Sequence, residues 1–172
     1  MQQLATNIRT LSLIGMPGAG KSTVGIILAK LTGLQFCDTD LDIQVREGAT
    51  LQQILDRSDY QALRAIEEEV LLAVDLDRSV ISTGGSAVYS EPVMTRLRSA
   101  GPLIYLQAEI DTLLPRVTAT PERGIASPGG QSFAQIYTER TALYAHHASY
   151  TIDVDNSNPD QIARSVLALL AR

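Results

Sequence analysis

Short apolar runs alternate along the chain with longer stretches in which apolar residues recur every three or four positions. The short runs predict strands, and the periodic stretches predict helices that bury one face. The expected strands span residues 10–14, 34–37, 80–83, 103–106 and 150–154. The expected helices span residues 21–31, 41–47, 51–57, 60–73, 92–100, 110–117, 133–145 and 159–171. This alternation is typical of an α/β fold with a mainly parallel sheet.

One polar segment interrupts the alternation. Residues 118–131 contain two prolines and three glycines and offer few side chains to a core. A polar loop of this length inside a compact domain is usually functional or mobile. Because Arg123 lies in its middle, we interpret the segment as a lid, with a plain surface loop as the alternative.

Composition narrows the class of protein. A chain of 172 residues fits one domain. Its net charge of −5 disfavours a nucleic-acid partner, because phosphate backbones bind basic surfaces. No apolar run reaches the ~20 residues of a membrane helix, and residues 1–7 lack the basic start and apolar core of a signal peptide. A single cysteine, Cys37, fits a reducing compartment. We therefore expect a cytoplasmic protein that binds neither membrane nor nucleic acid.

The strongest motif is GMPGAGKS at residues 15–22, which has the form G-x-x-x-x-G-K-[ST] of a phosphate-binding loop. Its glycines let the backbone curl so that N–H groups face phosphate oxygens. Lys21 adds a positive charge at the β- and γ-phosphates, and the Ser22 hydroxyl is a ligand for Mg²⁺. The expected strand before the motif and helix after it supply the required context. The motif predicts a nucleoside triphosphate bound with Mg²⁺.

Further polar and glycine residues follow the second and third expected strands. Ligands of open α/β sheets lie beyond the carboxyl ends of the strands, so Asp38 and Asp40 are expected near the phosphates. Such carboxylates can hold metal-bound water or accept a hydrogen bond from an attacking hydroxyl. The alternative is that one of them only caps the next helix. Gly84 and Gly85 indicate either backbone close to a substrate or a tight turn.

In this order and spacing, the motifs resemble those of the shikimate kinase family. The resemblance runs from Leu11 to about Val154. Its marks are the phosphate loop, F-x-D-x-D at 36–40, L-R-x-x-E at 63–67, ISTGG at 81–85, Arg123, and R-x-x-L-Y at 140–144.

The resemblance implies a kinase that uses ATP and Mg²⁺ to phosphorylate the 3-hydroxyl of shikimate, in aromatic amino-acid biosynthesis. It implies a three-layer α/β/α fold similar to nucleoside monophosphate kinases, with a five-stranded parallel sheet. Residues 1–172 would form a single domain, with a substrate-binding helical segment at about 39–75 and a mobile lid at about 118–132. The family expectation is a monomer.

The resemblance also implies a nucleotide site. Arg116, seven residues before Arg123, matches a position that packs on adenine. Ser22 would bind Mg²⁺ directly, and Asp38 would bind it through water. The implied nucleotide-binding residues are Gly18, Ala19, Gly20, Lys21, Ser22, Thr23 and Arg116.

On the acceptor side, the resemblance implies that Asp40 orients the attacking hydroxyl and is the candidate base. Arg64 and Arg140 would grip the substrate carboxylate, which planar guanidinium groups bind in bidentate fashion. The implied substrate-binding residues are Asp40, Arg64, Gly84, Gly85 and Arg140. The implied catalytic residues are Lys21, Asp40 and Arg123, with Arg123 closing onto the transferred phosphate.

Four positions on the acceptor side depart from the family pattern. Ser86 replaces a third glycine, Gly124 replaces the lid proline, and Leu55 and Leu63 replace aromatic residues. Losing aromatic faces removes large, rigid contact area from a small ligand. Two alternatives therefore stay open: a paralogue that phosphorylates another small hydroxy acid, and a nucleotide-binding regulatory module without phosphotransfer.

Overall fold

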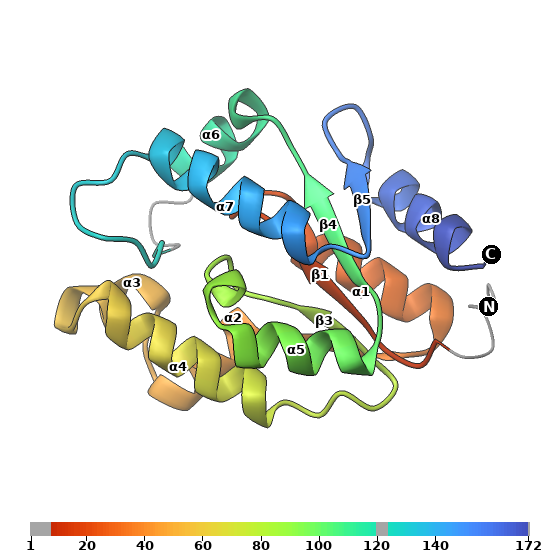
Figure 1. Cartoon of the computed structure of the whole chain (residues 1–172), viewed down its shortest axis with the longest axis horizontal. Coiled ribbons are helices and arrows are strands. Elements are labelled where there is room, and N and C mark those ends of the chain that lie inside the picture. The colour runs from red at the N-terminus through yellow and green to blue at the C-terminus, as the bar shows by residue number, and fades with distance from the viewer. Residues whose placement is uncertain (1–7, 120–123, 172) are drawn as a thin grey trace.

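A five-stranded parallel sheet forms the centre of the molecule (Figure 1). The computed structural model describes residues 8–119 and 124–171. The strands stand in the order β2-β3-β1-β4-β5, and each neighbouring pair is parallel. They are β1 (Leu11–Ile14), β2 (Gln35–Asp38), β3 (Ser79–Ser82), β4 (Leu103–Gln107) and β5 (Tyr150–Asp153). All five expected strands are confirmed to within one residue at each end.

Helices cover both faces of the sheet, which confirms the three-layer α/β/α fold. Helices α1 and α8 pack together on one face, and α5 and α7 lie on the other (Figure 1). The helices are α1 (Lys21–Thr32), α2 (Thr39–Glu47), α3 (Leu51–Arg57), α4 (Tyr60–Ala73), α5 (Glu91–Ala100), α6 (Ile110–Thr118), α7 (Phe133–His147) and α8 (Pro159–Leu170). Each was expected from the sequence.

Two local differences have physical reasons. Helix α2 begins at Thr39, two residues before the expected start, because the Asp38 side chain caps it by accepting from the Asp40 N–H. A short 3-10 helix, η1 (Ala87–Tyr89), was not expected. Three residues are too few for a hydrophobic period to reveal a helix.

Apolar side chains form two clusters. The larger one surrounds the sheet and includes the buried strand β1. The smaller one joins helices α2, α3 and α4 through Ile43, Ala49, Leu51, Ile54, Leu63 and Val70, and it also contains Ala126. Ala126 comes from the segment that precedes α7, so this part of the chain packs on helices α2, α3 and α4. Within residues 8–119 and 124–171, no helix has the length and hydropathy to cross a membrane.

Candidate active site

The phosphate loop connects β1 to α1 and encloses a lysine side chain. Gly20 has φ of 92°, a conformation that side-chain-bearing residues rarely adopt. Lys21 is only 8% exposed, and its Nζ donates to the carbonyls of Gly15 at 2.8 Å and Met16 at 3.1 Å. The ammonium group therefore lies inside the phosphate loop, and the loop ends at the start of α1, where backbone N–H groups and the helix dipole favour an anion.

Oxygen atoms gather beside the start of α1. The Ser22 hydroxyl lies 3.5 Å from that of Ser82 at the end of β3. Asp38 is the strand neighbour of Ser82, so its buried side chain belongs to the same region. One of its oxygens caps α2, as one alternative expected, and a further role of Asp38 in holding metal-bound water stays a prediction.

A hydroxyl and a carboxylate fit Mg²⁺, which takes oxygen ligands and usually keeps waters and substrate phosphates around it. Across the described residues, no group of three or more His, Cys, Asp and Glu side chains could hold a metal ion. A single hydroxyl and a single carboxylate suit a cation whose other ligands are waters and the phosphates of a nucleotide.

A first cavity extends from the phosphate loop toward α8. Its lining includes Gly18, Ala19, Gly20, Thr23, Val24, Arg116, Val154, Ser157, Pro159 and Ile162. Arg116 Nη1 donates to the Gly18 carbonyl at 3.1 Å, so the structure brings Arg116 to the phosphate loop. The contribution of the loop between β5 and α8 was not expected. The sequence could have indicated it, because this loop follows the carboxyl end of β5, just as the phosphate loop follows the carboxyl end of β1.

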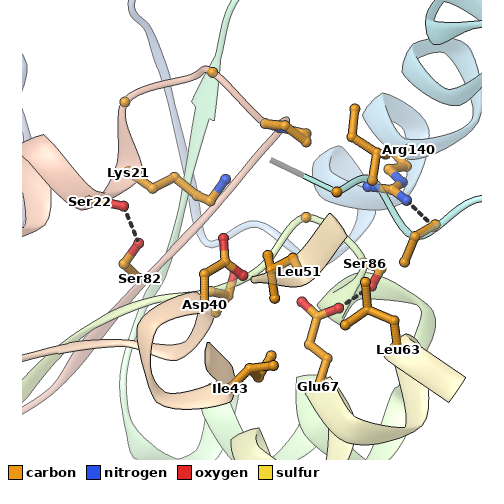
Figure 2. A pocket seen from close by; sticks show the side chains of 18 of the residues that line it. Lys21, Ser22, Asp40, Ile43, Leu51, Leu63, Glu67, Ser82, Ser86 and Arg140 are labelled. Carbon is orange, nitrogen blue, oxygen red and sulfur yellow. Dashed lines mark hydrogen bonds between the residues drawn. The ribbon is translucent and has the colours of Figure 1, made fainter. Parts of the chain in front are cut away.

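A second cavity lies between the phosphate loop and helices α2 to α4 (Figure 2). Lys21, Asp40, Glu67 and Arg140 all line it. The rest of its lining includes Pro17, Gly18, Gly20, Ser22, Thr23, Ser82, Thr83, Gly85, Ser86, Ile43, Leu51, Leu63, Gly124, Ile125 and Ala126. The structure thus brings residues from both sides of the expected reaction into one cavity.

The two glycines after β3 lie against charged side chains. A Cβ at Gly84 would come within 2.8 Å of Asp40 Oδ1 and still closer to a Glu67 carboxyl oxygen. A Cβ at Gly85 would come within 2.9 Å of Arg140 Nη1. The expected close approach of this backbone is therefore real, and its partners are charged side chains that line the cavity. A contact of these glycines with substrate stays a prediction.

Glu67 is a cavity residue that the sequence analysis did not assign to the site. It is 5% exposed, and burial raises the pKa of its carboxyl group to about 7, with the Asp40 charge adding to the rise. The Ser86 hydroxyl donates to its Oε2 and favours the ionised form, as do the charges of Arg140 and Lys21. Its Oε1 is buried without a hydrogen-bond partner. The sequence could have indicated its role, because Glu67 is a carboxylate among the apolar residues that α4 buries.

Two arginines meet at one backbone carbonyl. Arg140 on α7 is 1% exposed, and its Nη2 donates to the Ala126 carbonyl at 2.6 Å. Arg64 on α4 donates to the same oxygen at 3.2 Å. Arg64 is not part of the cavity lining, so it reaches the site beside Arg140 and does not face the cavity directly. The Nε atoms of both side chains are buried and have no hydrogen-bond partner.

The segment that carries Ala126 explains one departure from the family pattern. Gly124 has φ of 54°, and a Cβ there would lie 2.7 Å from the Gln52 nitrogen. Proline is fixed near a φ of −65° and could not adopt this conformation. Arg123, the expected lid arginine, lies outside the described residues.

Aliphatic side chains form the apolar wall of the cavity. Leu63 lines it together with Ile43 and Leu51, while Leu55 packs against the smaller apolar cluster behind them. This wall contains no aromatic ring among the residues that the structure describes.

Known proteins match this chain over nearly its whole length. A family model described as shikimate kinase matches residues 17–171. A shikimate kinase 2 of Enterobacter sp. (strain 638) is 34% identical over 163 residues, which cover 92% of this chain and 93% of the relative.

Solved structures of shikimate kinases are also similar to this chain. A shikimate kinase from Acinetobacter baumannii in complex with shikimate superposes with a TM-score of 0.86 at 29% identity, covering 95% of this chain and 93% of the other. A shikimate kinase from Aquifex aeolicus superposes with a TM-score of 0.76 at 26% identity, covering 93% and 94%.

Proposed function

Since the chain belongs to the shikimate kinase family, we propose that it transfers the γ-phosphoryl group of ATP to the 3-hydroxyl of shikimate. The products are shikimate 3-phosphate and ADP, in aromatic amino-acid biosynthesis. The observation that carries the proposal is a single cavity lined by Lys21 of the phosphate loop, Asp40 and Arg140.

Phosphoryl transfer depends on positioning and charge neutralisation more than on covalent chemistry. The ammonium group of Lys21 lies where it can offset negative charge on the β- and γ-phosphates. Ser22 would hold Mg²⁺ directly and Asp38 through water, and the ion would add positive charge at those phosphates. Arg116, already bound to the Gly18 carbonyl, would pack on adenine in the cavity beside α8.

Asp40 is the candidate base because it lines the cavity across from the phosphate loop. It would accept the proton of the attacking hydroxyl and hold that oxygen in line with the phosphorus. Glu67 is the other carboxyl group in this cavity. Its Oε2 already accepts a hydrogen bond from the Ser86 hydroxyl, so Asp40 is the better-placed candidate to accept one from the substrate.

Arg140 would bind the substrate carboxylate, with Arg64 beside it. Both side chains keep further N–H donors besides those given to Ala126, because a guanidinium group carries five. Two guanidinium groups close together suit a carboxylate, whose two oxygens can each accept from a different donor. The aliphatic wall of Ile43, Leu51 and Leu63 would contact the carbon ring of the acid.

A substrate-panel assay tests the proposal. Purified protein with ATP and Mg²⁺ should release ADP in a saturable manner at millimolar or lower shikimate. Turnover of another hydroxy acid, such as gluconate, without turnover of shikimate would contradict the proposed acceptor and identify a paralogue. ATP binding without ADP release on any acid would identify a regulatory module.

We further propose that the protein acts as a cytoplasmic monomer that needs neither nucleic acid nor membrane. Light scattering coupled to size exclusion tests the oligomeric state: the expected mass is that of one chain of 18.6 kDa.

A further inference from the structure

Arg64 and Arg140, which we propose bind the substrate carboxylate, are called the acid site below. Tyr89, at the end of η1, lies against both of them. The Arg64 Cζ is 3.7 Å from the centroid of the Tyr89 ring, and the Arg140 Cζ is 5.5 Å from it. Tyr60 adds a second ring at 5.0 Å from the Arg64 Cζ. Tyr89 does not line the cavity, so it acts on the site through the arginines.

The Tyr89 ring is itself held in place. Its hydroxyl donates to Glu139 Oε1 at 2.7 Å, and Glu139 Oε2 accepts from Gln131 at 3.3 Å. Burial raises the pKa of Tyr89, so its hydroxyl stays a donor at neutral pH. Glu139 precedes Arg140 on α7, and Tyr89 follows the Gly84–Ser86 turn. The ring therefore joins the two chain segments that border the acid side of the cavity.

An aromatic ring suits this place because it stabilises a cation without neutralising it. In the part of the chain that the structure describes, neither Arg64 nor Arg140 forms an ion pair. A carboxylate of the protein on these groups would compete with the carboxylate of a substrate. The π face and the Ala126 carbonyl fix the guanidinium groups without a direct ion pair, and the carboxylates of Glu67 and Glu139 act on them only through longer-range charge.

We propose that Tyr89, held by Glu139, is the positioning residue of the acid site and orients Arg64 and Arg140 for the substrate carboxylate. The proposal rests on the proposed function for the identity of the acid. Leu55 and Leu63 stand where the family pattern has aromatic residues, and Tyr89 supplies an aromatic ring at a different place. In this chain the aromatic surface lies behind the arginines and not against the carbon ring of the acid.

Steady-state kinetics test the proposal with three variants. Tyr89→Leu removes the ring, Tyr89→Phe keeps it, and Tyr150→Leu removes an exposed tyrosine of β5 as a matched control. We expect Tyr89→Leu to raise the KM for shikimate about tenfold, with the KM for ATP nearly unchanged. Tyr89→Phe should restore most of the affinity, and Tyr150→Leu should resemble the parent protein. A Tyr89→Leu variant in which both KM values are unchanged, or in which both rise alike, would overturn the proposal.

A measurement without substrate separates this proposal from the proposed function. In the ligand-free protein, the ring current should shift the NMR signal of the Arg64 Nε–H upfield, with the signal assigned by its loss in Arg64→Lys. The shift should persist in Tyr89→Phe and shrink strongly in Tyr89→Leu, where only the more distant ring of Tyr60 remains. An unshifted Arg64 signal in the parent protein would overturn the role of Tyr89 whichever acid the protein takes. If the parent protein shows the shift but does not turn over shikimate, the proposed acceptor fails and the positioning role stands.

Discussion

The buried carboxyl group of Glu67 makes stability depend on pH. Its pKa is raised from an ordinary value of 4.5 to about 7 in the folded protein. Between these pH values the folded state binds a proton that the unfolded state releases, so the contribution of Glu67 to stability is full below about pH 4.5. It is lost as the pH rises through about 7.

We therefore expect the free energy of unfolding of the parent protein, relative to Glu67→Gln, to fall between pH 5 and pH 7.5. Urea unfolding at several pH values measures it. Glu68→Gln, one residue along the same helix, is the control and should keep the pH dependence of the parent. Parallel curves for the parent and Glu67→Gln would show that Glu67 does not titrate in this window.

Substitutions of Asp40 and Arg64 should change different kinetic parameters. Asp40→Asn removes the base but keeps the size of the side chain, so kcat should fall about 100-fold or more. Arg64→Ala removes a charged hydrogen-bond donor, so the KM for shikimate should rise about tenfold or more. Kinetics at saturating ATP separate the two parameters. The reverse pattern in both variants would overturn the two assignments.

The sequence predicted the site residues that belong to a local motif. It missed those whose importance comes from contacts with residues far away along the chain. Lys21 and Ser22 belong to one continuous motif, and Asp40 directly follows a strand. Glu67 and Tyr89 matter because of Ser86, Asp40 and the two arginines, which lie far from them along the chain. Glu67 belongs to the pattern L-R-x-x-E at 63–67, but that pattern does not show which side chains Glu67 contacts, and no pattern marked Tyr89. Those expectations that depended on Arg123 stay predictions.

At the scale of elements, helix ends were predictable because residues at the ends mark them. Asn158 and Ser132 each form a capping box with a glutamine three residues later, and Gly33 ends α1 in a left-handed conformation. The strands were predictable as short apolar runs between such signals. The path of residues 124–126 was not, because it depends on the small apolar cluster formed by α2, α3 and α4.

That path makes a prediction about Gly124. Gly124→Pro restores the residue typical of the family, yet proline cannot adopt a φ of 54° and there is no room for its Cβ beside Gln52. The segment should shift and move the Ala126 carbonyl away from the arginines. We expect kcat/KM for shikimate to fall about tenfold or more.

Gly129→Ala is the matched control, because a Cβ at Gly129 would meet nothing within 4 Å. Its kcat/KM for shikimate should equal that of the parent. Equal values for Gly124→Pro and the parent would mean that the working enzyme does not use the path of residues 124–126 described above.

At the scale of the whole molecule, the strand order places two cavities side by side at the carboxyl ends of the strands. The nucleotide cavity lies toward α8, and the acid cavity lies toward α2, α3 and α4. Ligands that bind only the folded protein stabilise it, by about 2.7 kcal/mol at a concentration 100 times Kd. We expect ADP with Mg²⁺ and shikimate each to raise the Tm.

In Arg64→Ala, the rise in Tm with shikimate should shrink while the rise with ADP and Mg²⁺ persists. Thermal unfolding followed by circular dichroism measures both. Equal loss of the two responses would indicate that Arg64 supports the fold as a whole and not the acid cavity.

The Ala126 carbonyl has a thermodynamic consequence. It accepts one hydrogen bond from Arg64 and one from Arg140, so the placement of residues 124–126 and the orientation of the two guanidinium groups depend on each other. Binding of the acid and placement of this segment are then linked equilibria, and linkage is reciprocal. By whatever factor the placed segment favours the acid, the acid favours that placement, so a change on the outer side of this segment alters affinity without touching the substrate.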